Sequence, residues 1–307
     1  MSRLAPSPTG SLHLGHARTF LLTSWHVRAL GGRLVLRHED IDGTRRRPEV
    51  MGLIEEELRW LGIAWDGEPL VQSRRWSEHQ RAFERLREGG QIYPCICSHQ
   101  EVLRAARAPH ADEEVVYAGT CRGRFADLPA ALAATDRPVG WRFRVDAAVL
   151  QAEPDLVAAS WHPAPGYGGD FLVGRTGREG VFVPGYQLAV VVDDALAGVN
   201  LVVRGRDLLP STPRQRLLHA ALGTVAPAHA HLGLVLDGRG QRLAKRENPS
   251  HLVALRRSGV SAEDVRAWVA VSAGIATAAA REQDPAGFTL GPEHAGDVTA
   301  LREWCNS

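Results

Sequence analysis

The stretch SRLAPSPTGSLHLGHARTFLLTSWHVRALGGRLVLRHEDID, residues 2–42, carries the clearest fold signal in the chain. Residues 2–9 are typical of a short strand that runs into a loop. Residues 12–30 have apolar positions at helical spacing and stop at Gly31 and Gly32, a helix C-terminal signal. Residues 33–42 are typical of a strand with acidic residues at its carboxyl end. This order predicts a parallel sheet with crossover helices, which binds ligands at the carboxyl ends of its strands.

Beyond this stretch, the pattern predicts amphipathic helices over residues 47–62 and 77–90, the second with Ser77 as its N-cap. Residues 93–183 are rich in Gly, Pro and Ala with short periodic segments, which we interpret as an insertion. Regular patterns return after it. They predict buried strands over residues 189–192 and 200–205, a helix over 213–223, a strand over 231–237, and helices over 251–259 and 261–274.

The chain therefore divides into five predicted parts. Residues 1–92 and 184–238 are the two halves of the parallel-sheet domain, and residues 93–183 are the insertion between them. Residues 239–275 form a loop and a helical part, and residues 276–307 form a tail with little periodic signal.

Composition is typical of a soluble globular protein, with 44% hydrophobic and 23% charged residues. No apolar run reaches the length of about 18 residues expected of a membrane helix, and the N-terminus lacks a signal-peptide pattern. We therefore expect a cytoplasmic protein without a membrane partner. The net charge of +1 neither requires nor excludes nucleic acid. The arginine runs at residues 45–47 and 256–257 are interpreted as solvated faces, and no phosphate contact is assigned to them.

HLGH, residues 13–16, lies at the expected start of the first helix. His13 and His16 are three residues apart, so they share a helix face. A helix N-terminus offers free N–H groups and partial positive charge, which suit a phosphate, and two imidazoles can donate to a triphosphate. Gly15 lets a nucleotide approach the backbone. The alternative is a pair of ordinary surface histidines.

RLAKRE, residues 242–247, contains the only lysine among 36 Lys and Arg residues. An ammonium is a compact, mobile point charge, whereas a guanidinium is a rigid fork. Charge that develops on a phosphate beside a moving loop favours the compact group. This gives Lys245 a reason to occur here, against the alternative of chance survival at a surface site.

The two motifs together resemble the HIGH and KMSKS signatures of class I aminoacyl-tRNA synthetases. Further stretches resemble the glutamyl branch of that class, in the expected order and over about residues 3–275: residues 3–21, 37–45, 186–194, 202–209 and 236–247. Ala244 replaces a serine common in the second signature. The resemblance implies an α/β fold with a Rossmann-type parallel sheet, an inserted zinc-containing subdomain and a short C-terminal helical part.

By this resemblance, His13, Gly15, His16 and Lys245 bind ATP. Lys245, the two histidines and Mg²⁺ then stabilise the pyrophosphate that leaves when an amino acid carboxylate attacks the α-phosphate. His13, His16 and Lys245 are the predicted catalytic residues.

Glutamate presents one ammonium and two carboxylates, so its pocket needs one acidic group and arginines. The positions that match the family's glutamate-binding residues have this chemistry. We assign Glu39 to the ammonium and Arg3 and Arg204 to the carboxylates, with either arginine able to take the side-chain carboxylate. The full predicted set is Arg3, Leu4, Ala5, Pro6, Ser7, Glu39, Tyr186 and Arg204.

Cys95, Cys97 and Cys121 provide three thiolates, whereas structural zinc takes four ligands. Candidates for the fourth are Tyr117, His99 and His110, and the alternative is a set of reduced cysteines near a turn. Cys-x-Cys followed by Tyr-x-x-x-Cys resembles one subgroup, the glutamyl-queuosine tRNA(Asp) synthetases, which implies one structural Zn²⁺ on Cys95, Cys97, Tyr117 and Cys121. The long stretch at residues 104–114 keeps the histidines open as replacements for Tyr117.

After Lys245 only residues 246–307 remain, so we expect no anticodon-binding domain. The resemblance then implies glutamate activation without tRNA and transfer of glutamate to queuosine in the anticodon loop of tRNA(Asp), by a monomer. Three alternatives stay open: a truncated glutamyl-tRNA synthetase that charges the 3′ end, a small-molecule nucleotidyltransferase or ligase, and a non-catalytic RNA-binding paralogue. Intact HLGH and Lys245 disfavour the last.

Overall fold

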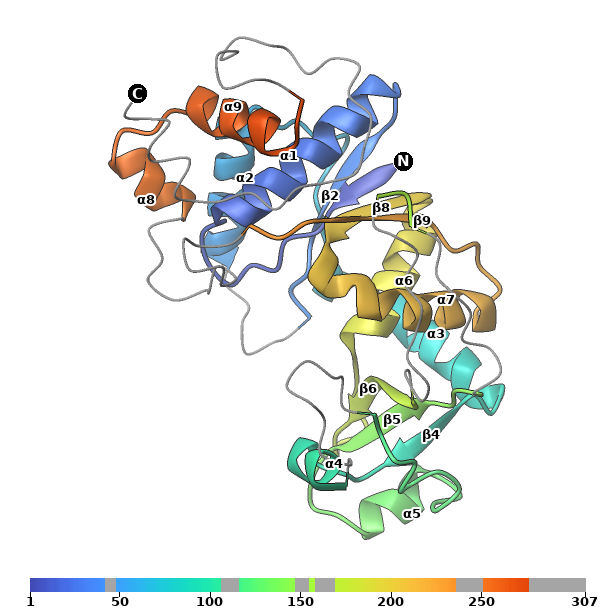
Figure 1. Ribbon diagram of the computed structural model, residues 1–307. Helices are drawn as coiled ribbons and strands as arrows, with labels where there is room; N and C mark the ends of the chain where they lie inside the picture. Colours follow the sequence, from blue (N-terminus) through green and yellow to red (C-terminus); the bar gives the residue numbers. More distant parts are fainter. Residues whose placement is uncertain (42–47, 106–115, 147–154, 158–168, 236–250, 276–307) are drawn as a thin grey trace.

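Figure 1 shows a computed structural model of the chain, which describes residues 1–41, 48–105, 116–146, 155–157, 169–235 and 251–275. The predicted parallel sheet is present. Strands β1 (Ser2–Leu4), β2 (Leu34–His38) and β3 (Leu70–Val71) pair in that order, all parallel. Strands β8 (Leu201–Gly205) and β9 (Ala228–Leu232) form a second parallel pair. The carbonyl of Met1 accepts hydrogen bonds from the backbone N–H groups of Asn200 and Leu201, which places β8 beside β1.

Helices cover this sheet, and an apolar core fills the space between the layers. Helix α1 (Leu14–Ala29) connects β1 to β2, and α2 (Pro48–Trp60) follows β2. Helices α8 (Leu252–Arg257) and α9 (Ala262–Ser272) come late in the chain and also contribute buried side chains to this core. Ser261 caps α9 with a capping box, the side-chain arrangement that satisfies free N–H groups at a helix start. The helices predicted at these positions are confirmed.

A second sheet is antiparallel and lies at the opposite end of the molecule from α1, α8 and α9 (Figure 1). Its strands β4 (Ile92–Cys95), β5 (Val139–Phe143), β6 (Phe171–Thr176) and β7 (Phe182–Pro184) pair in sequence order. Two short helices accompany it, α4 (His99–Ala105) and α5 (Leu128–Ala133). Its apolar face packs on α3 (Trp76–Glu88), α6 (Tyr186–Ala197) and α7 (Thr212–Ala221), which stand between the two sheets.

The strand predicted over residues 189–192 is wrong, because these residues lie inside α6. A short apolar run cannot distinguish a buried strand from a buried helix by its periodicity alone. The flanking glycines decide the outcome. Gly185 is the N-cap, and Gly198 ends the helix in the left-handed conformation with φ +69°.

Two smaller expectations also need correction. Ser77 is not the N-cap of α3, because the 3-10 helix Gln72–Arg74 runs directly into α3 and Arg75 occupies the N-cap position. The strand expected over residues 231–237 lies at β9 instead, three residues earlier. This strand contains buried His229 and His231, which a hydrophobicity pattern treats as polar positions. The pattern therefore places the start of the strand too late. None of the helices in the described ranges is long and apolar enough to cross a membrane.

Candidate active site and metal centre

The two histidines of HLGH form the N-terminal cap of α1. His13 is the N-cap residue, and its Nδ1 accepts a hydrogen bond from the backbone N–H of His16 at 3.3 Å. In return, Nδ1 of His16 accepts from the backbone N–H of His13, also at 3.3 Å. The two rings stack with centroids 3.7 Å apart. The prediction that both histidines lie on one face at the start of α1 is therefore confirmed.

This cap determines the tautomer of both rings. A neutral imidazole whose Nδ1 accepts a hydrogen bond carries its proton on Nε2. His13 and His16 therefore each keep an Nε2–H group as a donor at the N-terminus of a helix, where N–H groups and the helix dipole already favour an anion. The arrangement suits the phosphates of a nucleotide.

The structure gives a local reason for a glycine at position 15, which the sequence did not reveal. A Cβ at this position would lie 3.0 Å from Cε1 and 3.1 Å from Nδ1 of His13. Any side chain would therefore force the His13 ring to shift by a few tenths of an ångström.

The loop before HLGH is fastened from two sides. Glu57, on the buried face of α2, accepts hydrogen bonds from the Ser11 hydroxyl and, at 2.8 Å, from the Leu12 backbone N–H. Burial raises the pKa of Glu57. On the other side, Leu252 N–H donates to the Leu12 carbonyl at 2.8 Å, and His251 forms a β-bridge with His13. The position of HLGH is thus coupled to the segment that follows residues 236–250.

A buried charge network lies at the carboxyl end of β2. Arg37 is fully buried, and it donates to Asp194 of α6 and, at 3.0 Å, to Glu39. Arg3 of β1 pairs with the same Asp194 at 3.5 Å and donates to the Val203 carbonyl of β8 at 3.3 Å. Burial raises the pKa of Glu39, and the charge of Arg37 opposes that rise. The network therefore brings β1, β2, β8 and α6 together around Glu39.

Arg204, on β8, is 5% exposed and has a different kind of partner. Its Nε, Nη1 and Nη2 donate to His231 Nε2 at 3.0 Å, Gln215 Oε1 at 2.8 Å and Thr212 Oγ1 at 2.8 Å. All three acceptors are neutral. Arginine has five N–H donors, so these bonds leave one on each terminal nitrogen for a further acceptor. Burial lowers the pKa of Arg204, and a carboxylate ligand would compensate that desolvated charge.

Tyr186 connects the two groups of charges. Its side chain is 40% exposed, but the protein atoms around its hydroxyl desolvate that group and raise its pKa, as does the charge of Glu39, while Arg204 and Arg3 oppose the rise. The four side chains therefore lie within electrostatic reach of one another. The structure thus brings together Arg3, Glu39, Tyr186 and Arg204, which the sequence predicted as one pocket.

The other predicted residues stand as follows. Leu4 and Pro6 are buried, Ala5 is partly buried and Ser7 is exposed. The Pro6 carbonyl accepts a hydrogen bond from Glu39 N–H at 3.0 Å, which ties the first loop to the pocket. Lys245 lies outside the described residues, as do the arginines at positions 45–47.

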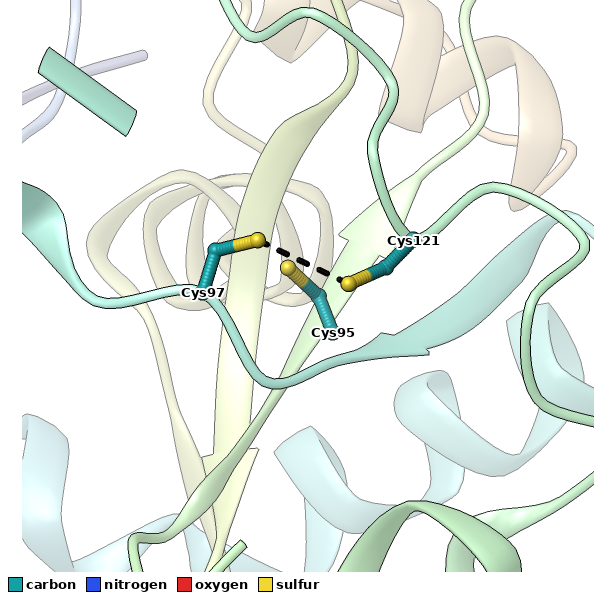
Figure 2. Close-up of side chains that lie close together, drawn as sticks. All are labelled: Cys95, Cys97 and Cys121. Carbon is teal, nitrogen blue, oxygen red and sulfur yellow. Dashed lines mark hydrogen bonds between the residues drawn. The ribbon is translucent and has the colours of Figure 1, made fainter. Parts of the chain in front are cut away.

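Cys95, Cys97 and Cys121 converge at the end of β4, as Figure 2 shows. Their sulfur atoms lie within 4.8 Å of one another, and those of Cys97 and Cys121 are 3.6 Å apart. The hydroxyl of Tyr117 lies 3.4 Å from the sulfur of Cys95 and 3.6 Å from that of Cys97. Four donor atoms thus surround one point.

These distances fit a tetrahedral zinc site. With Zn–S bonds of about 2.3 Å and a Zn–O bond of about 2.0 Å, neighbouring sulfurs lie about 3.8 Å apart and the oxygen about 3.5 Å from each sulfur. Tyr117 is 7% exposed and adjacent to the sulfurs, whereas His99 is exposed at the start of α4. His110 lies outside the described residues. The geometry therefore favours Tyr117 as the fourth ligand.

Two functional candidates, Glu57 and Arg142, were not predicted from the sequence. Glu57 had a signal, since it is an acid at an apolar position of an amphipathic helix. Arg142 of β5 had none. Its Nε donates to the Cys95 sulfur at 3.3 Å, and its guanidinium lies 3.7 Å above the Tyr117 ring, where it would offset the negative charge of a thiolate- and phenolate-bound metal.

Known proteins resemble the chain in sequence and in fold. Residues 1–280 match the family of catalytic domains of class I tRNA synthetases (E and Q). A glutamyl-Q tRNA(Asp) synthetase from Symbiobacterium thermophilum is 45% identical over 89% of this chain and 86% of that protein. One from Nitratidesulfovibrio vulgaris is 42% identical with the same coverage.

Solved structures share the fold. A glutamate tRNA ligase from Elizabethkingia meningosepticum superposes with a TM-score of 0.79 at 23% identity, over 99% of this chain and 68% of that one. The glutamate-tRNA synthetase of Elizabethkingia anophelis superposes with a TM-score of 0.78 at 24% identity, over 99% of this chain and 69% of that one. By fold and by sequence, the chain is a ligase that belongs to the class I tRNA synthetases, in the family of the glutamyl-Q tRNA(Asp) synthetases.

Proposed function

We propose that this ligase activates L-glutamate with ATP in the absence of tRNA, and transfers the glutamyl group to queuosine at the wobble position of tRNA(Asp). The observation that carries the first half is the pocket of Arg3, Glu39, Tyr186 and Arg204, whose charges complement an amino acid with one ammonium and two carboxylates. The names of its relatives support the second half.

Glu39 binds the substrate ammonium in this proposal. Its carboxylate is buried, and Arg37 fixes one oxygen at 3.0 Å. Arg204 binds one substrate carboxylate. It is the better placed of the two arginines, because its direct partners are neutral, whereas Arg3 already shares the carboxylate of Asp194. Arg3, on the neighbouring strand β1, binds the second carboxylate.

In the activation step an oxygen of the substrate α-carboxylate attacks the α-phosphorus of ATP, the bond to the bridging oxygen breaks, and pyrophosphate leaves. The Nε2–H groups of His13 and His16 donate to the phosphates. Lys245 approaches the same phosphates from its loop. Mg²⁺, bound with ATP, would neutralise part of the pyrophosphate charge.

In the transfer step a hydroxyl oxygen of the queuosine cyclopentenediol attacks the carbonyl carbon of glutamyl-adenylate. The bond to the phosphate oxygen breaks, AMP leaves, the hydroxyl proton passes to water, and an ester to the modified base forms. Because AMP is a good leaving group, the step needs no strong general base, and we assign none.

One Zn²⁺ on Cys95, Cys97, Tyr117 and Cys121 belongs to the same proposal. It would join the end of β4 to the loop that carries Tyr117 and Cys121. It is structural, since four protein ligands close the site. The insertion, residues 93–183, would then present a fixed surface to the anticodon loop, and the enzyme would act as a monomer.

Activation is tested by ATP–pyrophosphate exchange without tRNA, with glutamate, glutamine and aspartate in parallel. We expect exchange with glutamate. Glu39→Gln should raise the KM for glutamate about 10-fold to 100-fold, because a charged hydrogen bond is lost. Glu49→Gln, an exposed acid at the start of α2, serves as the control. Exchange that requires added tRNA would refute the tRNA-independent step.

The site of transfer is tested with queuosine-containing tRNA(Asp) from which the 3′-terminal adenosine has been removed. Such tRNA keeps the modified base but cannot be charged at its end. We expect full acceptance of labelled glutamate. Loss of acceptance would instead identify an enzyme that charges the 3′ end.

A further inference from the structure

Asp155 belongs to a short described segment between β5 and β6, yet it contacts β9 of the parallel sheet. The Leu156 N–H donates to the His229 carbonyl at 2.9 Å, and the His231 N–H donates to Asp155 Oδ1 at 3.1 Å. The side chains of Asp155 and His231 are 1% and 0% exposed. The segment therefore places a buried carboxylate beside a buried imidazole.

Asp155, His231 and Arg204 form a continuous chain of hydrogen bonds. Asp155 Oδ2 contacts His231 Nδ1, and His231 Nε2 is 3.0 Å from Arg204 Nε. A carboxylate only accepts and a guanidinium only donates. His231 must therefore carry a proton on Nδ1 and a lone pair on Nε2. The ring is therefore neutral; burial lowers the pKa of His231, and the hydrogen bond to Asp155 opposes that shift.

We propose that Asp155 is a positioning residue for glutamate, which fixes the tautomer of His231 and thereby holds Arg204 where it binds a substrate carboxylate. This inference rests on the proposed function of Arg204. It goes beyond that function, because a residue outside the strands of the parallel sheet would then determine the position of Arg204 in the proposed amino acid pocket. In this proposal Asp155 acts on the substrate through His231 and Arg204.

The substitution Asp155→Asn tests this link because the structure determines how the amide would turn. Asp155 Oδ1 accepts from two backbone N–H groups, those of Val157 at 3.0 Å and His231 at 3.1 Å. An amide oxygen can keep both bonds only if its NH₂ group faces His231 Nδ1. His231 Nδ1 must then accept a hydrogen bond from the amide, so the ring proton moves to Nε2. The Nε2–H group then faces the Arg204 Nε–H group, and two donors point at each other.

We expect Asp155→Asn to raise the KM for glutamate in ATP–pyrophosphate exchange by about 10-fold to 100-fold, the range expected for an opposed buried donor. The KM for ATP should stay within about two-fold of wild type, because the nucleotide site at HLGH is separate. Asp136→Asn is the matched control, since Asp136 is a fully exposed acid in the same insertion. An unchanged KM for glutamate in Asp155→Asn would overturn the proposal.

A second measurement is independent of activity. In protein labelled with ¹⁵N-histidine, two-bond ¹H–¹⁵N spectra report the tautomer of each ring, and His231→Gln assigns the His231 signals. We expect the proton on Nδ1 in wild type and on Nε2 in Asp155→Asn. If the His231 ring of the wild-type protein carries its proton on Nε2, the proposed hydrogen-bond chain from Asp155 to Arg204 is wrong, whatever KM values are measured. Absence of glutamate-dependent exchange, together with the expected tautomers, would refute the proposed function. It would leave the hydrogen-bond chain from Asp155 to Arg204 supported.

Discussion

The proposed amino acid pocket and the cysteine cluster both gather polar groups from distant parts of the chain, but they balance charge in different ways. In the pocket, Arg37 and Arg3 share Asp194, so most charges are already paired within the protein. In the cluster, three thiols and a phenol face one another, and the cation in contact with them among the described residues is Arg142. We infer that the pocket is organised before its ligand binds, whereas the cluster depends on its metal.

The largest effect should follow from breaking the cluster. Cys121→Ser removes one of the four proposed zinc ligands, and structural zinc contributes on the order of 10 kcal/mol in small zinc domains. We expect zinc content to fall from about one per chain to below about one tenth, with a lower Tm that no longer responds to chelator. Elemental analysis and thermal unfolding measure both. Cys305→Ser is the control, and loss of zinc there or full zinc in Cys121→Ser would contradict the ligand set.

Arg37→Met tests whether the pocket is held by internal pairing. It leaves Asp194 and Glu39 without their shared cation in a buried site, which typically destabilises a protein by about 3–5 kcal/mol. Urea unfolding of the variant measures the change. Arg33→Met, at an exposed position before β2, should change stability by less than about 0.5 kcal/mol. A small effect in Arg37→Met would mean that the pocket, like the cluster, is organised by its ligand.

Lys245→Arg extends the comparison to the nucleotide side of the pocket. If Lys245 stabilises charge that develops on the leaving pyrophosphate, a guanidinium in its place should lower the kcat of exchange about 100-fold. The KM for glutamate should be unchanged, since the amino acid pocket is intact. Arg242→Lys, three residues earlier in the RLAKRE sequence, is the matched control. Near-normal turnover by Lys245→Arg would remove Lys245 from the mechanism.

Gly15→Ala should give the smallest effect. The new Cβ would approach the His13 ring to about 3.0 Å and shift it by a few tenths of an ångström. Misplacement on this scale should lower kcat/KM for ATP about 10-fold. Gly52→Ala, where a Cβ meets nothing within 4 Å inside α2, is the control and should be neutral or slightly stabilising. Equal kinetics in the two variants would show that the cap does not depend on Gly15.

Local signals in the sequence predicted most of the helices and the parallel sheet, whereas the proposed glutamate-binding residues came from the resemblance to the glutamyl synthetases. HLGH follows a strand and begins a helix, and Glu39 directly follows β2, so adjacency in the chain was sufficient there. The helix α6 was missed because a buried apolar run has the same composition in a strand and in a helix.

Long-range partners could not be predicted in this way. Asp155 lies far along the chain from His231, and no periodic pattern connects them. The same holds for Arg142 beside Cys95 and for the choice between Tyr117 and His99, since burial and direction depend on how the loops pack. These contacts are tertiary, and one sequence contains no direct record of them.

The most direct test of the account is transfer of radiolabelled glutamate, with ATP and Mg²⁺, to two pools of tRNA. One pool comes from cells that make queuosine and the other from cells that cannot. Label on the first pool alone is the predicted result and would identify the modified base as the acceptor. Equal label on both pools would contradict the account and assign the enzyme to ordinary charging of the tRNA 3′ end.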